Sequence, residues 1–176
     1  MANHTEIIMT GTGGQGLIFL ASFIAEAAML AGKNVAQTQS YGIAQRGGFI
    51  SAEVVADDGE ILFQQVTKPD IIIVLNEVAG KRYDAATAPV LYDSSLMVKE
   101  GFANWHGIPF TRIASDLGSA RSANMVAVGS MLAFLPFVDG KFFEEAAAGK
   151  NRATAELGIK AIWEGMAVAE KLSGRG

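Results

Sequence analysis

The sequence contains no cysteine, which excludes disulfide bonds, thiolate metal ligands, cysteine-held iron–sulfur clusters and cysteine nucleophiles within this chain. It has only two histidines, His4 and His106, and these lie too far apart for the usual spacing of metal ligands. The Gly-x-Ser-x-Gly segment that carries the nucleophile of many hydrolases is also missing. We therefore expect no metal site in this chain and no residue that acts as a catalytic acid, base or nucleophile.

Positive charge and long apolar runs are scarce as well. The chain has 14 Lys and Arg residues against 18 Asp and Glu residues, and the net charge of −4 argues against a general nucleic-acid binder. The most apolar run, 17–31, contains Glu26 and is too short to span a membrane. Since the N-terminus also lacks the basic region of a signal peptide, we expect a cytoplasmic protein that contacts neither a membrane nor nucleic acid.

The residues that are present have the pattern of a globular α/β protein. Half of the 176 residues are apolar and 18% are charged, so we expect one domain over residues 1–176. Apolar extended segments predict strands at 6–10, 34–39, 49–56, 60–64, 71–75, 89–92 and 107–113. Helical patterns lie at 17–31, 79–87, 125–135, 142–149 and 155–172. The alternation predicts a three-layer α/β/α sandwich, Rossmann-like, with a mainly parallel sheet and one hairpin between 49–56 and 60–64.

A glycine turn, Gly11-Thr-Gly-Gly-Gln-Gly16, follows the first predicted strand and precedes the first predicted helix. Glycines permit positive φ and close approach of a ligand, and the free amides of a new helix attract an anion. Glycine turns also occur where a helix merely packs tightly on a sheet. A dinucleotide site would need a carboxylate about 20 residues further on, but Val35 to Gln39 offer none. No Gly-Lys-Ser or Gly-Lys-Thr follows the turn, so a nucleoside triphosphate site is disfavoured too.

A second unusual loop, Ser40-Tyr-Gly-Ile-Ala-Gln-Arg-Gly-Gly48, follows the second predicted strand. Loops after successive parallel strands gather at one edge of a sheet, so we expect this loop to face the glycine turn. Arg46 would then offer a fork for a phosphate or carboxylate, and Tyr41 an aromatic face or a hydroxyl. The alternative is a surface loop whose arginine is solvated or pairs with an acid.

Taken together, the glycine turn, the run Gln37-Thr-Gln-Ser-Tyr-Gly42 and Arg46-Gly-Gly48 resemble the γ subunit of the 2-oxoacid:ferredoxin (acceptor) oxidoreductases. This family acts on pyruvate, ketoisovalerate, 2-oxoglutarate or indolepyruvate. The resemblance covers most of the chain, including Val66-Thr-Lys-Pro-Asp70 and Asn124. The sequence departs from the family where Ile43, Ala44 and Gln45 replace the usual Pro and Glu, and the C-terminal third, with Ala147-Ala-Gly-Lys-Asn151, matches least well. These departures leave the substrate class open.

The resemblance implies a role as one subunit of an enzyme that acts on the oxo group of its donor and makes an acyl-CoA, CO2 and a reduced acceptor. It implies that α and β chains hold thiamine diphosphate and Mg, and that iron–sulfur clusters lie on partner chains, among them a possible ferredoxin-like δ chain. The γ unit would bind no cofactor alone and would help to accommodate coenzyme A, the co-substrate. The lack of cysteine and of a Gly-Asp-Gly then Asn-Asn thiamine-diphosphate motif agrees with this division.

By the same resemblance, the residues that contact coenzyme A or a neighbouring subunit fall into three groups. They are the turn residues Gly11, Gly13, Gly14, Gln15 and Gly16, the loop residues Ser40, Tyr41, Gly42, Arg46, Gly47 and Gly48, and Asn124. Arg46 is assigned to a coenzyme A phosphate or to a carboxylate of another subunit. Asn124 either binds a polar group of a ligand or caps the helix predicted at 125–135. Two alternatives remain: a stand-alone nucleotide or flavin binder, and a purely structural assembly subunit.

Overall fold

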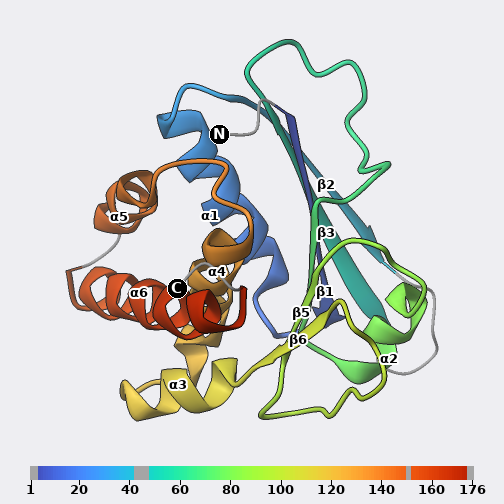
Figure 1. The fold of residues 1–176 in the computed structure, drawn as a ribbon. Helices are drawn as coiled ribbons and strands as arrows, with labels where there is room; N and C mark the ends of the chain where they lie inside the picture. The colour runs from blue at the N-terminus through green and yellow to red at the C-terminus, as the bar shows by residue number, and fades with distance from the viewer. Residues whose placement is uncertain (1–3, 42–47, 150–151, 174–176) are drawn as a thin grey trace.

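The computed structural model describes residues 4–41, 48–149 and 152–173, which form a six-stranded sheet with helices on both faces (Figure 1). The strands are β1 (His4–Thr12), β2 (Asn34–Tyr41), β3 (Phe49–Asp57), β4 (Ile71–Val74), β5 (Val90–Asp93) and β6 (Trp105–Ile108). The α-helices are α1 (Leu17–Leu30), α2 (Glu77–Gly80), α3 (Phe110–Asp116), α4 (Ala123–Phe134), α5 (Gly140–Ala148) and α6 (Arg152–Ser173). Two 3-10 turns, η1 (Lys81–Tyr83) and η2 (Ala120–Ser122), complete the described elements. None of these helices has the length and hydropathy of a membrane crossing.

The strand order is β2-β3-β1-β4-β5-β6. The strands β1, β4, β5 and β6 pair in parallel, whereas β3 is antiparallel to both β1 and β2. The predicted α/β class with a mainly parallel sheet is therefore confirmed. The return strand predicted at 60–64 is wrong, because β1 and β2 already occupy both hydrogen-bonding edges of β3. The chain instead leaves β3 as an irregular segment, and the hairpin partner of β3 is β2.

The strand predicted at 107–113 is also wrong beyond Ile108. Pro109 follows, lacks an N–H for the ladder, and stands directly before α3. The buried carboxylate of Asp93 accepts hydrogen bonds from the backbone N–H of Thr111, at 3.1 Å, and from its hydroxyl, at 2.5 Å. A carboxylate at the first turn favours the helix, so the segment after Pro109 turns helical instead of extending the sheet.

Side chains alternate between the two faces of the strands and form two separate hydrophobic cores, one on each face of the sheet. One face of the sheet packs against α1 and α4, with α5 and α6 outside them, as Figure 1 shows. Its fully buried strand residues include Ile7, Met9, Ile71, Ile73, Leu91 and Ile108. The opposite face carries a smaller cluster around Trp105 and Tyr92, covered by η1 and the adjoining loops. The sandwich is therefore thick on the α1 face and thin on the α2 face.

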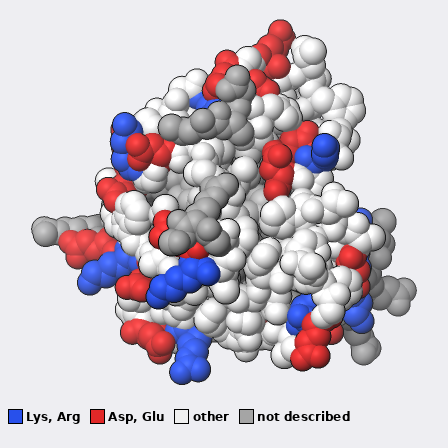
Figure 2. Space-filling model, viewed as in Figure 1, with Lys and Arg blue, Asp and Glu red and all other residues white. Residues whose placement is uncertain are grey.

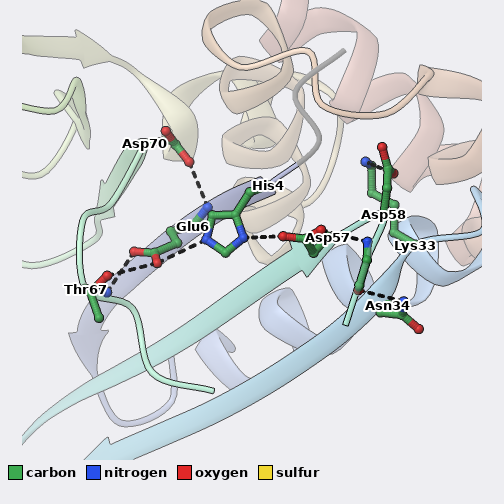
Figure 3. Close-up of polar contacts among 9 residues, drawn as sticks. His4, Glu6, Lys33, Asn34, Asp57, Asp58, Thr67 and Asp70 are labelled. Carbon is green, nitrogen blue, oxygen red and sulfur yellow. Dashed lines mark hydrogen bonds and ion pairs between the residues drawn. The ribbon is translucent and has the colours of Figure 1, made fainter. Parts of the chain in front are cut away.

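A polar network lies at the end of the sheet where β1 begins and β3 ends (Figure 3). His4 lies between two carboxylates, with Nδ1 2.5 Å from Asp57 Oδ2 and Nε2 3.2 Å from Glu6 Oε1. The hydrogen bond to Asp57, followed by that to Glu6, raises the pKa of His4. Burial works to raise the pKa of Glu6, but hydrogen bonds from Lys68 N–H, His4 and Thr67 outweigh it and lower that pKa. The network thus joins the start of β1 to the end of β3 and to the residues before β4.

Two glycines allow α4 and α6 to pack in direct backbone contact. A Cβ on Gly129 would overlap the carbonyl of Ile162, and one on Gly165 would overlap the carbonyl of Val126. The hydroxyl of Ser130 adds a hydrogen bond of 3.1 Å to the carbonyl of Gly165. The position of α4, which carries Asn124 in its first turn, depends on this close contact.

We predict that Gly129→Ala destabilises the chain by about 3 kcal/mol or more, because the new methyl group meets backbone that no rotamer change can move. Gly158→Ala is the matched control, since a Cβ there lies 3.8 Å from Met125 Cγ, in ordinary contact. The control should be neutral or stabilising by about 1 kcal/mol, the helix-propensity gain of alanine over glycine. Urea unfolding of both variants measures the difference, and equal stabilities would contradict the packing argument.

Candidate functional site

The parallel strands end at a shared edge of the sheet, the carboxyl edge, and a cleft of about 480 Å3 opens there. The glycine turn follows β1 at this edge, and the starts of α3 and α4 lie across from it. The lining includes Gly14, Gln15, Gly16, Asp93, Arg121 and Asn124. Backbone amides, a cation and a side-chain amide therefore meet at the position where ligands bind in open α/β sheets.

The glycine turn adopts a conformation that requires glycine at two positions. Gly14 has φ 87° and Gly16 has φ 73°, both in the left-handed region that side chains avoid. Gly16 is the N-cap of α1, and among the described residues no side chain caps that helix. The first turn of this 14-residue helix, which contains no acidic residue, thus places its amides and its positive end beside the cleft.

The side chain of Gln15 holds the turn in shape. Its Oε1 accepts hydrogen bonds from the backbone N–H of Thr12, at 2.7 Å, and from the Thr12 hydroxyl, at 3.2 Å. Its Nε2 donates to the carbonyl of Leu75, just beyond β4, at 2.7 Å. A Cβ on Gly11 would overlap Oε1 of Gln15, which explains the glycine there. The sequence predicts Gln15 as a ligand contact, but in the structure its side-chain amide makes its hydrogen bonds to Thr12 and Leu75 of the same chain.

Two residues from distant sequence complete this edge. Asn124, predicted from sequence, lies in the first turn of α4 so close to the glycine turn that a Cβ on Gly16 would be 3.1 Å from its Nδ2. It is not the N-cap, which is Ser122, although its Oδ1 accepts from the N–H of Met125 at 2.9 Å. Arg121, exposed in η2, also lines the cleft. Sequence reasoning missed Arg121, because no motif surrounds it and only the fold brings it here.

A second hollow of about 470 Å3 adjoins the cleft, because both share Arg121 and Asn124. Its other walls are mainly apolar and include Phe19 and Phe23 of α1 and Met125 of α4. The rings of Phe19 and Phe23 are stacked, with centroids 6.1 Å apart. The combined recess therefore runs from a polar end at the glycine turn to a more apolar end along α1.

The second sequence loop begins and ends at the same edge. Tyr41 pairs with Ile50 and Thr12 pairs with Phe49, so the end of β2, the start of β3 and the glycine turn are neighbours. Ser40 and Tyr41 are exposed, and Gly48 lies just before β3. Gly42, Arg46 and Gly47 lie outside the described residues, so their predicted contacts stay predictions. A cation that the sequence did not reveal, Arg82, lies 4.4 Å above the ring of Phe49.

The topology explains why the dinucleotide interpretation fails. In a dinucleotide site the acid that binds the ribose ends the strand beside β1. Here that neighbour is β3, which runs antiparallel and places its start, not its end, at the carboxyl edge. Asp93, the acid that lines the cleft, is buried and holds Thr111 and the N–H of Ser95. It acts as a structural anchor of α3.

Several known proteins are similar to this chain in sequence. The family model of the pyruvate ferredoxin/flavodoxin oxidoreductases matches residues 6–168. A 2-oxoglutarate synthase subunit KorC of Archaeoglobus fulgidus is 36% identical, over 98% of this chain and 92% of that protein. Its counterpart in Methanocaldococcus jannaschii is 35% identical, over 95% of both.

Solved structures agree with the sequence relatives. The γ subunit of a keto/oxoacid ferredoxin oxidoreductase from Geobacter sulfurreducens superposes with a TM-score of 0.80 at 33% identity, over 94% of this chain and 98% of that one. A second structure is a 2-oxoglutarate:ferredoxin oxidoreductase from Magnetococcus marinus, solved with 2-oxoglutarate, coenzyme A and succinyl-CoA bound. It superposes on this chain with a TM-score of 0.81 at 23% sequence identity. The match covers 97% of this chain but 32% of the Magnetococcus chain, and it shows a shared fold.

We predict that Gln15→Glu destabilises the chain at neutral pH, because a carboxylate oxygen would then face the carbonyl of Leu75, at a cost of about 1–3 kcal/mol. The introduced carboxyl group could donate to that carbonyl only when protonated, so its pKa in the folded state would be raised. The deficit should therefore shrink as the pH falls from about 8 to about 5. Thermal unfolding across this range measures it, with exposed Gln39→Glu as control. A deficit independent of pH would contradict the hydrogen-bond assignment.

Proposed function

Because the chain belongs to the pyruvate ferredoxin/flavodoxin oxidoreductase family, we propose that it is the γ subunit of a multi-subunit 2-oxoacid:acceptor oxidoreductase. The observation that carries the proposal is the extent of the match, which covers nearly all of this chain and nearly all of the Archaeoglobus and Geobacter proteins. The complex would convert a 2-oxoacid, coenzyme A and an oxidised acceptor into an acyl-CoA, CO2 and a reduced acceptor.

The partner chains would supply the redox chemistry. Thiamine diphosphate with Mg, on α and β chains, would stabilise the carbanion formed on decarboxylation, and iron–sulfur clusters on partners, including a ferredoxin-like δ chain, would accept electrons. This chain has no cysteine with which to hold a cluster. Its contribution would be to bind and orient coenzyme A beside that active site. The names of the relatives favour 2-oxoglutarate as the oxoacid.

The cleft at the carboxyl edge has features that suit the charged end of coenzyme A. The first turn of α1 offers backbone amides to a phosphate, and Arg121 offers a guanidinium from the opposite wall. The amide of Asn124 lies beside Gly16 and would bind a polar group. The less polar part of the molecule would then follow the adjoining hollow along Phe19 and Phe23. Tyr41 and Arg46 of the second loop would close the site or contact a partner.

The first test is purification of the full-length tagged chain from its native host. We expect thiamine-diphosphate-dependent α and β chains to co-purify with it, because under the proposal the chain is one subunit of a complex with them. Recovery of the chain alone, with tight binding of FAD or NAD measured by calorimetry, would instead support a stand-alone nucleotide binder. The missing ribose acid argues against that result.

In the purified complex, we predict that Arg121→Ala raises the KM for coenzyme A about tenfold or more, because a charge-assisted hydrogen bond to phosphate is lost. The KM for the 2-oxoacid and the assembly of the complex should not change. Arg112→Ala is the matched control, since Arg112 is exposed on α3 and does not line the cleft. An unchanged KM for coenzyme A in Arg121→Ala and in Arg46→Ala would support a purely structural subunit.

A further inference from the structure

The segment between β3 and β4, here called the 58–70 loop, exposes two large apolar side chains next to each other. Leu62 is 86% exposed and Phe63 is 66% exposed. The sequence pattern predicts a strand here, but the apolar run contributes to neither core at these two positions. Isolated apolar residues are common on protein surfaces, whereas an adjacent pair at a protruding loop is a feature of interaction sites.

The loop is held at both ends. At its start, Lys33 Nζ donates to Asp58 at 2.6 Å, and Asn34 Nδ2 donates to the carbonyl of Gly59 at 2.8 Å. Near its end, the buried carboxylate of Glu6 accepts hydrogen bonds from the N–H groups of Thr67 and Lys68. Figure 3 shows the contacts of Lys33, Asn34 and Thr67, with His4 and Asp57 between them. The loop that carries the two apolar side chains is thus anchored on both sides of them, which lowers the entropy that binding would cost.

The charge around the pair limits what can cover it. The segment 57–65 has three carboxylates and no basic residue, but Asp57 is paired with His4 and Asp58 with Lys33. The carboxylate next to the apolar pair that is left for a partner is Glu60, which is exposed. Figure 2 shows acidic side chains gathered at the top of the molecule beside uncharged surface, where Figure 1 places the start of this loop. A second copy docked through the same face would bring the two Glu60 carboxylates together, which is unfavourable. A partner with an apolar pocket bordered by Lys or Arg fits both the pair and its rim.

The location is separate from the candidate coenzyme A site. Asp57 pairs with His4 at the start of β1, whereas the glycine turn follows the other end of the same strand. A contact at the 58–70 loop therefore leaves the cleft at the carboxyl edge open.

Resting on the proposed function, we propose that Leu62 and Phe63 anchor this chain to another subunit of its own oxidoreductase, in an apolar pocket with a basic rim. The carboxylate of Glu60 steers and orients the contact, while the two apolar side chains supply most of its affinity. This contact, at the end of the sheet opposite the cleft, would keep the cleft positioned beside the active site of the partner chains.

The test is co-expression of the full-length chain with the other subunits, followed by purification through a tag on this chain. We expect Leu62→Ser with Phe63→Ser to weaken assembly about a hundredfold or more, because two buried anchors are lost. The isolated double variant should unfold at the temperature of the wild type, since neither side chain is in a core. Val98→Ser with Leu172→Ser, which removes two apolar groups exposed elsewhere, should assemble like the wild type.

Each outcome decides between the proposals. Full assembly of the Leu62→Ser, Phe63→Ser variant would overturn the anchor and leave the proposed function intact. Absence of any thiamine-dependent partner on the wild-type chain would overturn both. Light scattering of the isolated wild type should show a monomer, and a dimer that the double variant abolishes would assign the surface to a second copy. Glu60→Gln should slow association and reduce its salt dependence, whereas an unchanged salt dependence would contradict the basic rim.

Discussion

The antiparallel position of β3 between β1 and β2 is the constraint on which the rest of the structure depends. Because both edges of β3 are paired, the chain after Asp57 cannot return alongside β3, and it crosses to β4 as an exposed loop. Because β3 reverses direction, β2 runs the same way as β1, and the two loops that the sequence singles out emerge at one edge. The same reversal removes the strand end at which a dinucleotide-binding acid would stand. One pairing thus locates both candidate surfaces.

The two ends of the sheet differ in the charge they present. At the carboxyl edge, backbone amides face a cleft together with Arg121, while the neighbouring acid Asp93 is buried and engaged by α3. At the opposite edge, Glu6 and Asp57 are engaged around His4, Asp58 is paired with Lys33, and Glu60 extends the negative charge onto the loop. An anionic ligand is attracted to the first edge and repelled by the second. A subunit arranged in this way can bind a phosphate-bearing co-substrate at one end and a basic partner at the other without competition between them.

The sequence predicted what depends on local pattern. The fold class, most helices and the glycine turn follow from apolar periodicity and from glycine spacing, and the resemblance to a γ subunit added Asn124. It did not predict Arg121 at the cleft or Arg82 over Phe49, because their positions depend on how η2 and η1 pack. It misplaced a strand at 60–64 for a related reason. Leu62 and Phe63 are apolar enough for a strand, but the predicted partner, β3, already has both edges paired, which no local pattern reveals.

The glycine turn shows how one motif combines separate physical requirements. Gly11 makes room for Gln15, Gly14 and Gly16 supply positive φ, and Gly16 also admits Asn124, so three of the four glycines are explained by the protein itself. The hydrogen bonds of Gln15 to Thr12 and Leu75 set the shape of the turn before any ligand arrives. A preset turn offers its backbone amides at little entropic cost, but backbone amides recognise a phosphate whatever acid is attached to the rest of the molecule. Under the proposed function, selection among 2-oxoacids therefore falls to the partner chains, and this chain contributes a site for the co-substrate that all of them share.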